Sequence, residues 1–219
     1  MSHFTQLDEG IELAEDLDPA GLGLPVRVPA VGGQHRMDLD AAERAAADFL
    51  AALGMDLNAA HLQRSPARMA QAWAQMLTPR EFNLTTFPNE EKYDQLVMVR
   101  DIPVRSLCEH HLLPFTGKAC VGYLPGERIV GLSKLARIVE HFSCRPQTQE
   151  RLTQQIANWL QDELNPRAVG VVIAAEHSCM TLRGVNTPGT STVTSALLGH
   201  LRRSASARQE FLSFSGLMN

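Results

Sequence analysis

A run of six residues, Ser106-Leu107-Cys108-Glu109-His110-His111, places a thiol, a carboxylate and two imidazoles at four consecutive positions. A second cluster, Glu176-His177-Ser178-Cys179, follows much later in the chain. Thiolate and imidazole are the ligands that zinc prefers, and a catalytic zinc site keeps three protein ligands and one open position. The two clusters therefore predict a zinc site.

Five side chains are candidate ligands: Cys108, His110, His111, His177 and Cys179. The Cys-x-x-His spacing brings Cys108 and His111 together across a turn, and His177 and Cys179 would share one face of a strand. Two cysteines and one histidine satisfy a catalytic zinc and leave two histidines over; the residues alone do not decide which histidine binds. A closed Cys2His2 site, or core residues without a metal, are the alternatives, and five ligands in two short clusters favour a metal site.

Basic residues predict an anion site near the metal. Ser133, Lys134 and Arg137 place a hydroxyl and two cations at one helix start, and helix N-termini bind phosphate through free N–H groups. Arg183 follows the second cluster closely, and Arg68 lies near the start of an N-terminal helix. Taken singly, each cation is more simply a solvated side chain; beside a zinc they are consistent with an anionic substrate.

Glu150, with Gln149 before it, lies at the start of a longer predicted helix. Its carboxylate can accept two hydrogen bonds from a planar base edge. It can equally balance the dipole at the helix N-terminus. The residues support both interpretations equally.

The elements that must position these residues indicate an α+β fold, an antiparallel sheet with two helices on one face. We expect three regions: a flexible acidic tail over 1–37, an N-terminal helical region over 38–92 and a catalytic domain over 93–219. The first helix begins at Asp38 or Asp40 and ends at Gly54, and the second begins at Ser65. The expected later strands are 95–107 with a break near Pro103, 115–124, 128–130, 168–175 and 180–183, and the expected helices are 134–142 capped by Ser133, 146–164 and 190–203. Residues 80–92 are expected to form a loop.

The composition is that of a globular protein, with 44% hydrophobic and 20% charged residues among 219. A net charge of -4 argues against a nucleic-acid or membrane-surface binder. The sequence has no apolar run long enough for a transmembrane helix and no signal-peptide pattern, which predicts a cytoplasmic protein. Its four cysteines are then interpreted as thiols or metal ligands.

Several of these segments together resemble the GTP cyclohydrolase I family, over roughly residue 40 to the end. The matching pieces are long, ordered and specific: VRDI (99–102), SLCEHH (106–111), GKA (117–119), IVGLSKLAR (129–137), RPQTQERLT (145–153), HSC (177–179), RG (183–184) and RQEFL (208–212). The resemblance implies a tunnelling fold, in which sheets of several subunits close a barrel. It also implies a homodecamer with active sites between subunits, and possible allosteric control.

The resemblance assigns roles to matching residues. Zinc is held by Cys108, His111 and Cys179, and His110 and His177 are the acid/base histidines, with Ser133 assisting at the ribose. Glu150 holds the guanine edge with Gln149 beside it, and the triphosphate is held by Ser133, Lys134, Arg137, Arg183 and Arg68. Related sequences often carry a lysine where this chain has Gln71, which implies one cation fewer. Glu109 has no assigned role; we expect it to be a partner of a histidine.

The implied reaction is hydrolysis of GTP at guanine C8, release of formate and rearrangement to 7,8-dihydroneopterin triphosphate, the first step of pterin and tetrahydrofolate biosynthesis. Two alternatives remain. One is another tunnelling-fold enzyme, such as the NADPH-dependent nitrile reductase of queuosine synthesis, which does not need the Cys-Glu-His-His cluster. The other is a non-catalytic paralogue, which the complete set of Cys and His residues disfavours.

Overall fold

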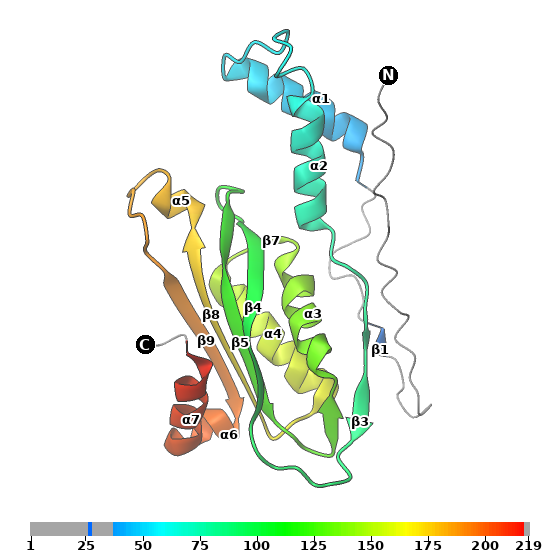
Figure 1. The fold of residues 1–219 in the computed structure, drawn as a ribbon, viewed down its shortest axis with the longest axis vertical. Coiled ribbons are helices and arrows are strands. Elements are labelled where there is room, and N and C mark those ends of the chain that lie inside the picture. The colour runs from blue at the N-terminus through cyan, green and yellow to red at the C-terminus, as the bar shows by residue number, and fades with distance from the viewer. Residues whose placement is uncertain (1–25, 28–36, 217–219) are drawn as a thin grey trace, which may run out of the picture.

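The centre of the molecule is a five-stranded sheet with the order β7-β4-β5-β8-β9, seen in Figure 1. A computed structural model describes residues 26–27 and 37–216. The long strands β4 (Val97–Cys108), β5 (Pro114–Leu124), β8 (Ala168–His177) and β9 (Thr192–Gly199) pair with antiparallel neighbours. The two-residue strand β7 (Pro146–Gln147) runs parallel to the end of β4.

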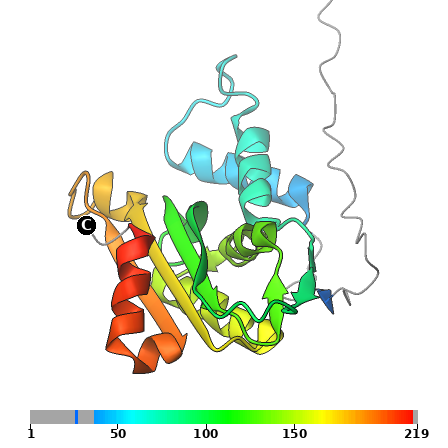
Figure 2. The same ribbon diagram turned by 60° about the horizontal axis from the view of Figure 1, so that its bottom comes forward.

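Two helices, α3 (Leu132–Ser143) and α4 (Gln149–Leu164), cover one face of the sheet. The core between these layers is made of side chains that are fully buried, among them Leu135, Ile138, Leu152 and Ile156. The short helix α6 (His200–Arg203) and helix α7 (Ala205–Ser215) lie on the opposite face (Figure 2). The predicted α+β arrangement is confirmed at this level.

Glycines let α7 approach the sheet closely. A Cβ atom at Gly170 would lie 2.7 Å from the Phe211 ring, and one at Gly122 would lie 3.1 Å from it. A real Cβ atom is essentially never as close as 2.7 Å to another atom, and 3.1 Å is a tight contact, so the absence of a side chain at Gly170, aided by Gly122, makes room for the buried Phe211 ring. The tunnelling fold itself describes how several chains assemble and stays a prediction.

The N-terminal helices α1 (Leu39–Ala52) and α2 (Ser65–Leu77) pack on each other and stand away from the sheet (Figure 1). The Asp38 carboxylate accepts a hydrogen bond of 2.9 Å from the Ala41 N–H, which is the predicted helix cap. Gly54 follows α1 in the left-handed conformation, with φ 84°. Both predicted helices are therefore present. No helix among the described residues is long and apolar enough to cross a membrane.

Residues 80–92 contain two short strands rather than a loop alone. β2 (Asn83–Leu84) pairs with β1 (Val26–Arg27), and β3 (Thr86–Pro88) pairs with β6 (Arg128–Val130). Segments this short are stabilised by partners distant in sequence, so local composition does not reveal them. The predicted tail over 1–37 lies outside the described residues except for 26–27 and 37, and the division into three regions stays a prediction.

The last third of the chain differs most from the expected elements. The helix expected over 190–203 is instead strand β9 followed by α6, because the β-branched residues Thr192, Val193 and Thr194 pair with β8. The strand expected over 180–183 is instead the end of the short helix α5 (Ser178–Thr181) and the start of a loop. The prediction that His177 and Cys179 share a strand face is therefore wrong.

Three further boundaries are corrected. The irregularity in β4 lies between Val99 and Ile102, where Asp101 has φ 56°, and Pro103 pairs regularly with Lys118. Proline is tolerated at this position because the side of β4 opposite β5 has no paired strand here among the described residues.

The starts of α3 and α4 are also shifted. Ser133 lies inside the first turn of α3, whose N-cap is Gly131, so it does not cap the helix. The long helix α4 begins at Gln149 rather than Pro146, because the Thr148 hydroxyl caps it by accepting a hydrogen bond from the Arg151 N–H.

Candidate metal centre

The two clusters of ligand residues meet at one edge of the sheet. Cys108 is the last residue of β4, His177 is the last residue of β8, and Cys179 lies in α5. Both strands pair with β5, and Ser106 and His177 are register partners of the same residue, Phe115. The ligand atoms of Cys108, His177 and Cys179 all lie within 4.8 Å of one another.

A tight turn after Cys108 brings two more imidazoles to the same place. The Cys108 carbonyl accepts hydrogen bonds from the N–H groups of His111 and Leu112, and Leu112 has a left-handed φ of 53°. The Nδ1 atom of His110 is 3.8 Å from the Cys108 Sγ, and that of His111 is 4.0 Å from it. The imidazoles of His110 and His111 thus lie near the Cys108 thiol, and that of His177 lies near both thiols.

This set of donors fits a zinc ion. Two thiols and an imidazole are the ligand types that form tetrahedral zinc sites. Burial and the neighbouring Cys108 thiol raise the pKa of the Cys179 thiol, since two thiolates at this distance repel each other. A bound cation would relieve that repulsion. The three residues whose ligand atoms lie within 4.8 Å of one another, Cys108, His177 and Cys179, form a compact group that contains His177. The family resemblance instead implies His111 as the histidine ligand, and that assignment stays a prediction.

Gln149 holds the His177 ring. The Gln149 side chain is buried, and its Nε2 donates to the carbonyl oxygens of Ile173 (3.0 Å) and Thr192 (2.9 Å). Carbonyl oxygens only accept, so the amide orientation is determined, and Oε1 faces His177 Nε2 at 2.8 Å. His177 Nε2 therefore carries the proton, and Nδ1 carries the lone pair.

The ring of His177 is also stacked on Phe115, with ring centroids 4.4 Å apart and planes 11° apart. Burial lowers the pKa of His177, which favours the neutral imidazole. These contacts support a positioning role for Gln149. Its predicted contact with substrate stays a prediction.

Replacing Gln149 by leucine is expected to destabilise each chain by about 2 kcal/mol, or about 4–8 °C in Tm. Leucine has a similar size, but it leaves the Ile173 and Thr192 carbonyl oxygens without their donor. Thermal unfolding measures the effect, with Gln154→Leu as the control because Gln154 is exposed on the same helix. Equal Tm values for the two variants would contradict this account of Gln149.

Glu109 is oriented by Arg151, a residue for which the sequence predicts no role. The Arg151 guanidinium donates to the Glu109 carboxylate, to Gln147 Oε1 at 2.9 Å and to the Pro146 carbonyl at 2.9 Å. The other Glu109 oxygen lies 4.0 Å from His110 Nε2. Glu109 therefore connects His110 to the start of α4, in agreement with the expectation that it is a partner of a histidine.

The remaining predicted site residues divide into two groups. Arg183 and Glu150 lie near the candidate metal centre. Burial raises the pKa of Cys179, and Arg183 opposes this with a smaller effect. Burial lowers the pKa of His177, and Glu150 opposes this with a smaller effect. By contrast, Ser133, Lys134 and Arg137 lie in the N-terminal half of α3, whose opposite end approaches β4.

Arg68 is separate again, because it lies in the first turns of α2, on the helix pair that stands away from the sheet. One chain therefore brings the candidate metal ligands Cys108, His177 and Cys179 close to Glu150 and Arg183. It does not bring Ser133, Lys134, Arg137 and Arg68 to the same point.

Comparison with known proteins gives a consistent result. The sequence model of a family described as GTP cyclohydrolase I matches residues 42–216. A protein of Sulfurihydrogenibium sp. named GTP cyclohydrolase 1 is 48% identical over 81% of this chain and 95% of its own length. One of Aquifex aeolicus with the same name is 47% identical over 80% of this chain and 96% of its own length.

The solved structures include a more distant likeness. The crystal structure of the archaeosine synthase QueF-Like in the apo form is 17% identical, with a TM-score of 0.40, and covers 48% of this chain and 93% of that chain. A likeness at this level supports no conclusion about the fold or the activity of the present chain.

Proposed function

Because this chain belongs to the GTP cyclohydrolase I family, we propose that it is a zinc-dependent GTP cyclohydrolase that opens the guanine ring at C8. It releases formate and forms 7,8-dihydroneopterin triphosphate, the precursor for pterin and folate biosynthesis. The observation that carries the zinc dependence is the convergence of Cys108, His177 and Cys179 within 4.8 Å. The cytoplasmic location stays a prediction.

A metal ion held at the candidate metal centre would supply the nucleophile for this reaction. Cys108 and Cys179 would hold zinc together with one of the three histidines, His111 in the family assignment. When bound, zinc lowers the pKa of water toward ~7 and so provides hydroxide at neutral pH.

The other residues orient the substrate and move protons. Glu150 is exposed in the first turn of α4, next to His177, where its carboxylate can accept two hydrogen bonds from the guanine edge. Arg183 is exposed and near Cys179, and its guanidinium can pair with phosphate oxygens.

His110 is suited to proton transfer because its side chain is 67% exposed and its Nε2 lies near the Glu109 carboxylate. An exposed imidazole beside a carboxylate can both give and take protons during a reaction. We assign to His110 the protonation of guanine N7 during ring opening. His177, with its proton fixed on Nε2, presents the Nδ1 lone pair.

We also propose that the active enzyme is a homo-oligomer. In the described residues, β9 has a partner on one side only, and β4 is unpaired on one side along residues 97–106. Open edges at the two ends of one sheet can pair head-to-tail and close a ring. Such a ring would also allow a second chain to contribute Ser133, Lys134 and Arg137. The number of ten subunits rests on the resemblance alone.

Incubation with GTP is expected to yield formate and, after oxidation, a fluorescent pterin. A zinc chelator should abolish both products, and added zinc should restore them, because the nucleophile depends on the metal. Formate release in a fully metal-free protein would contradict the zinc dependence. Oxidation of NADPH with a nitrile substrate, without formate release from GTP, would instead support the reductase alternative.

A further inference from the structure

A chain of side-chain hydrogen bonds leads from the buried end of α3 to the turn after Cys108. Gln147 is fully buried, and its Nε2 donates to the Phe142 carbonyl at 2.8 Å and to Gln155 Oε1 at 2.9 Å. The Phe142 carbonyl only accepts, so the orientation of the Gln147 amide is determined. Its Oε1 then accepts a 2.9 Å hydrogen bond from Arg151 Nε. The Arg151 side chain is therefore attached to a rigid, buried group.

The same guanidinium holds Glu109. Arg151 Nη2 donates to the Pro146 carbonyl at 2.9 Å and to Glu109 Oε2. The main chain of Glu109 is fixed on the same segment, because its N–H donates to the Gln147 carbonyl at 3.0 Å. Both the backbone and the carboxylate of Glu109 are thus held by residues 146–151, at the start of α4.

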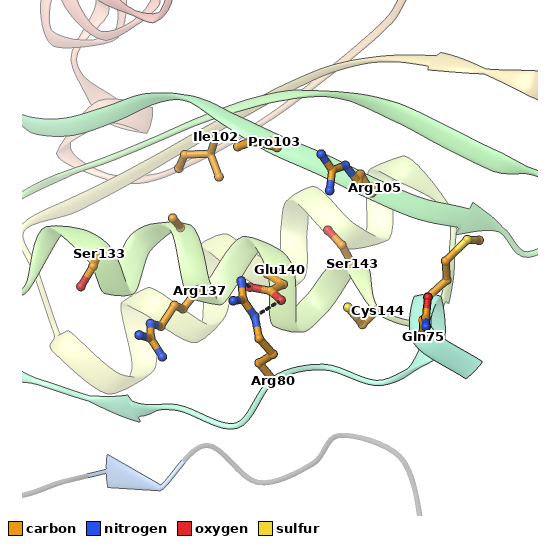
Figure 3. Close-up of a pocket in the computed structure, with 12 residues that line it drawn as sticks. Gln75, Arg80, Ile102, Pro103, Arg105, Ser133, Arg137, Glu140, Ser143 and Cys144 are labelled. Atoms are coloured by element: carbon orange, nitrogen blue, oxygen red, sulfur yellow. Dashed lines mark hydrogen bonds and ion pairs between the residues drawn. The ribbon is translucent and has the colours of Figure 1, made fainter. Parts of the chain in front are cut away.

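The way in which Arg151 holds this carboxylate leaves one oxygen available. In another arginine–glutamate pair, Arg80 donates 2.6 Å hydrogen bonds to both oxygens of Glu140 (Figure 3). Arg151 instead bonds Oε2 of Glu109, and Oε1 lies 4.0 Å from His110 Nε2. On the other side of the ring, His110 Nδ1 lies 3.8 Å from the Cys108 Sγ. The exposed His110 ring therefore has a fixed carboxylate beside Nε2.

We propose that Arg151 is a positioning residue for proton transfer, which keeps the His110 ring oriented toward the guanine ring by holding Glu109. The proposal rests on the proposed function, in which His110 protonates guanine N7. An exposed imidazole without a fixed neighbour samples several rotamers, whereas a base oriented by a third group is a recurring arrangement in enzymes. The Arg151 guanidinium already has three acceptors. Its loss should therefore slow the chemical step and leave GTP binding unchanged.

The test measures formate release from GTP by zinc-loaded wild type and Arg151→Gln. We expect kcat to fall about 10- to 100-fold, the usual effect of removing a group that orients a site residue. The KM for GTP and the zinc content should not change. Arg151→Lys keeps the charge but not the fork of donors, so it should recover part of the lost kcat.

A double-variant comparison shows whether Arg151 acts through Glu109. Glu109→Gln should lower kcat by a factor similar to that of Arg151→Gln. The two changes remove the same interaction, so the double variant should be no slower than the slower single variant. Glu109→Gln also leaves the buried Gln147 contact intact, and it therefore tests the proposal even if Arg151→Gln folds poorly.

Hydrogen exchange gives a measurement that does not depend on activity. The N–H groups of Glu109, His111 and Leu112 are all hydrogen-bonded in the turn. A peptide spanning 108–113 should exchange its amide hydrogens faster in Arg151→Gln than in wild type, as measured by mass spectrometry. Arg203→Gln is the matched control for kcat and exchange, and neither should change. Arg203 is exposed on α6, which follows the end of β9 that pairs with the start of β8, away from His177.

Four results would overturn the proposal. An unchanged kcat in Arg151→Gln would leave Arg151 without a role in the reaction. A raised KM with an unchanged kcat would make it a substrate-binding residue. Loss of zinc from Arg151→Gln would mean that it supports the metal, and multiplicative losses of kcat in the double variant would show that Arg151 and Glu109 act separately. If wild type releases no formate from GTP, the proposed function fails, and the exchange measurement still decides whether Arg151 holds the turn.

Discussion

Replacing Cys179 by alanine is expected to remove the bound metal and to lower GTP turnover by about a thousandfold or more. Cys179 is one of three residues whose ligand atoms lie within 4.8 Å of one another. A catalytic zinc has three protein ligands, so the loss of one leaves too few to hold the ion in place. Without the metal, no group near neutral pKa supplies hydroxide at the guanine ring.

The matched control is Cys120→Ala, which also removes one thiol. Cys120 is fully buried on β5, near Met98, in the smaller core cluster that faces α7. That variant should keep its metal and its activity and lose only some thermal stability, because a small cavity is left. Metal content by mass spectrometry and formate release are measured on both proteins. A full complement of metal in Cys179→Ala, or turnover without metal, would show that Cys179 is not a ligand.

The two ligand clusters are visible in the sequence because a metal site needs particular side chains at short spacing. Cys108 and His111 are three residues apart, and His177 and Cys179 are two apart, so each half of the site is local. The resemblance then joins the halves, and the structure brings Cys108, His177 and Cys179 together. The thiols are therefore predictable from sequence, and so is the α+β class of the fold.

The residues that orient the ligands are not predictable in the same way. Gln149 holds His177 through carbonyl groups on β8 and β9, and Arg151 reaches Glu109 across 42 positions of sequence. Nothing local in the sequence reveals such contacts, since they exist only after the sheet and α4 have packed together. Strand β9 is missed for a related reason: pairing with β8 decides its conformation, while its own short sequence is compatible with a helix.

Three histidines compete for the role of metal ligand. His110 and His111 lie near the Cys108 sulfur, whereas His177 lies near both thiols, and one of the three would complete a three-ligand site. His177 is the member of the compact group, but its ring is already held by Gln149 and stacked on Phe115. His111 is exposed on the turn after Cys108, and its Nδ1 lies 4.0 Å from the Cys108 Sγ.

His111→Ala is therefore expected to lose the metal, whereas His110→Ala should keep it and lose about 10²- to 10⁴-fold in turnover, the usual contribution of a general acid or base. The two residues are adjacent and both exposed, so the variants are matched in position and in the atoms removed. Metal content separates the two roles independently of activity.

Metal loss in His110→Ala alone would reverse the two roles. Metal loss in His177→Ala, with His111→Ala fully loaded, would instead make the compact group of Cys108, His177 and Cys179 the actual site, and would leave both histidines of the turn free to move protons.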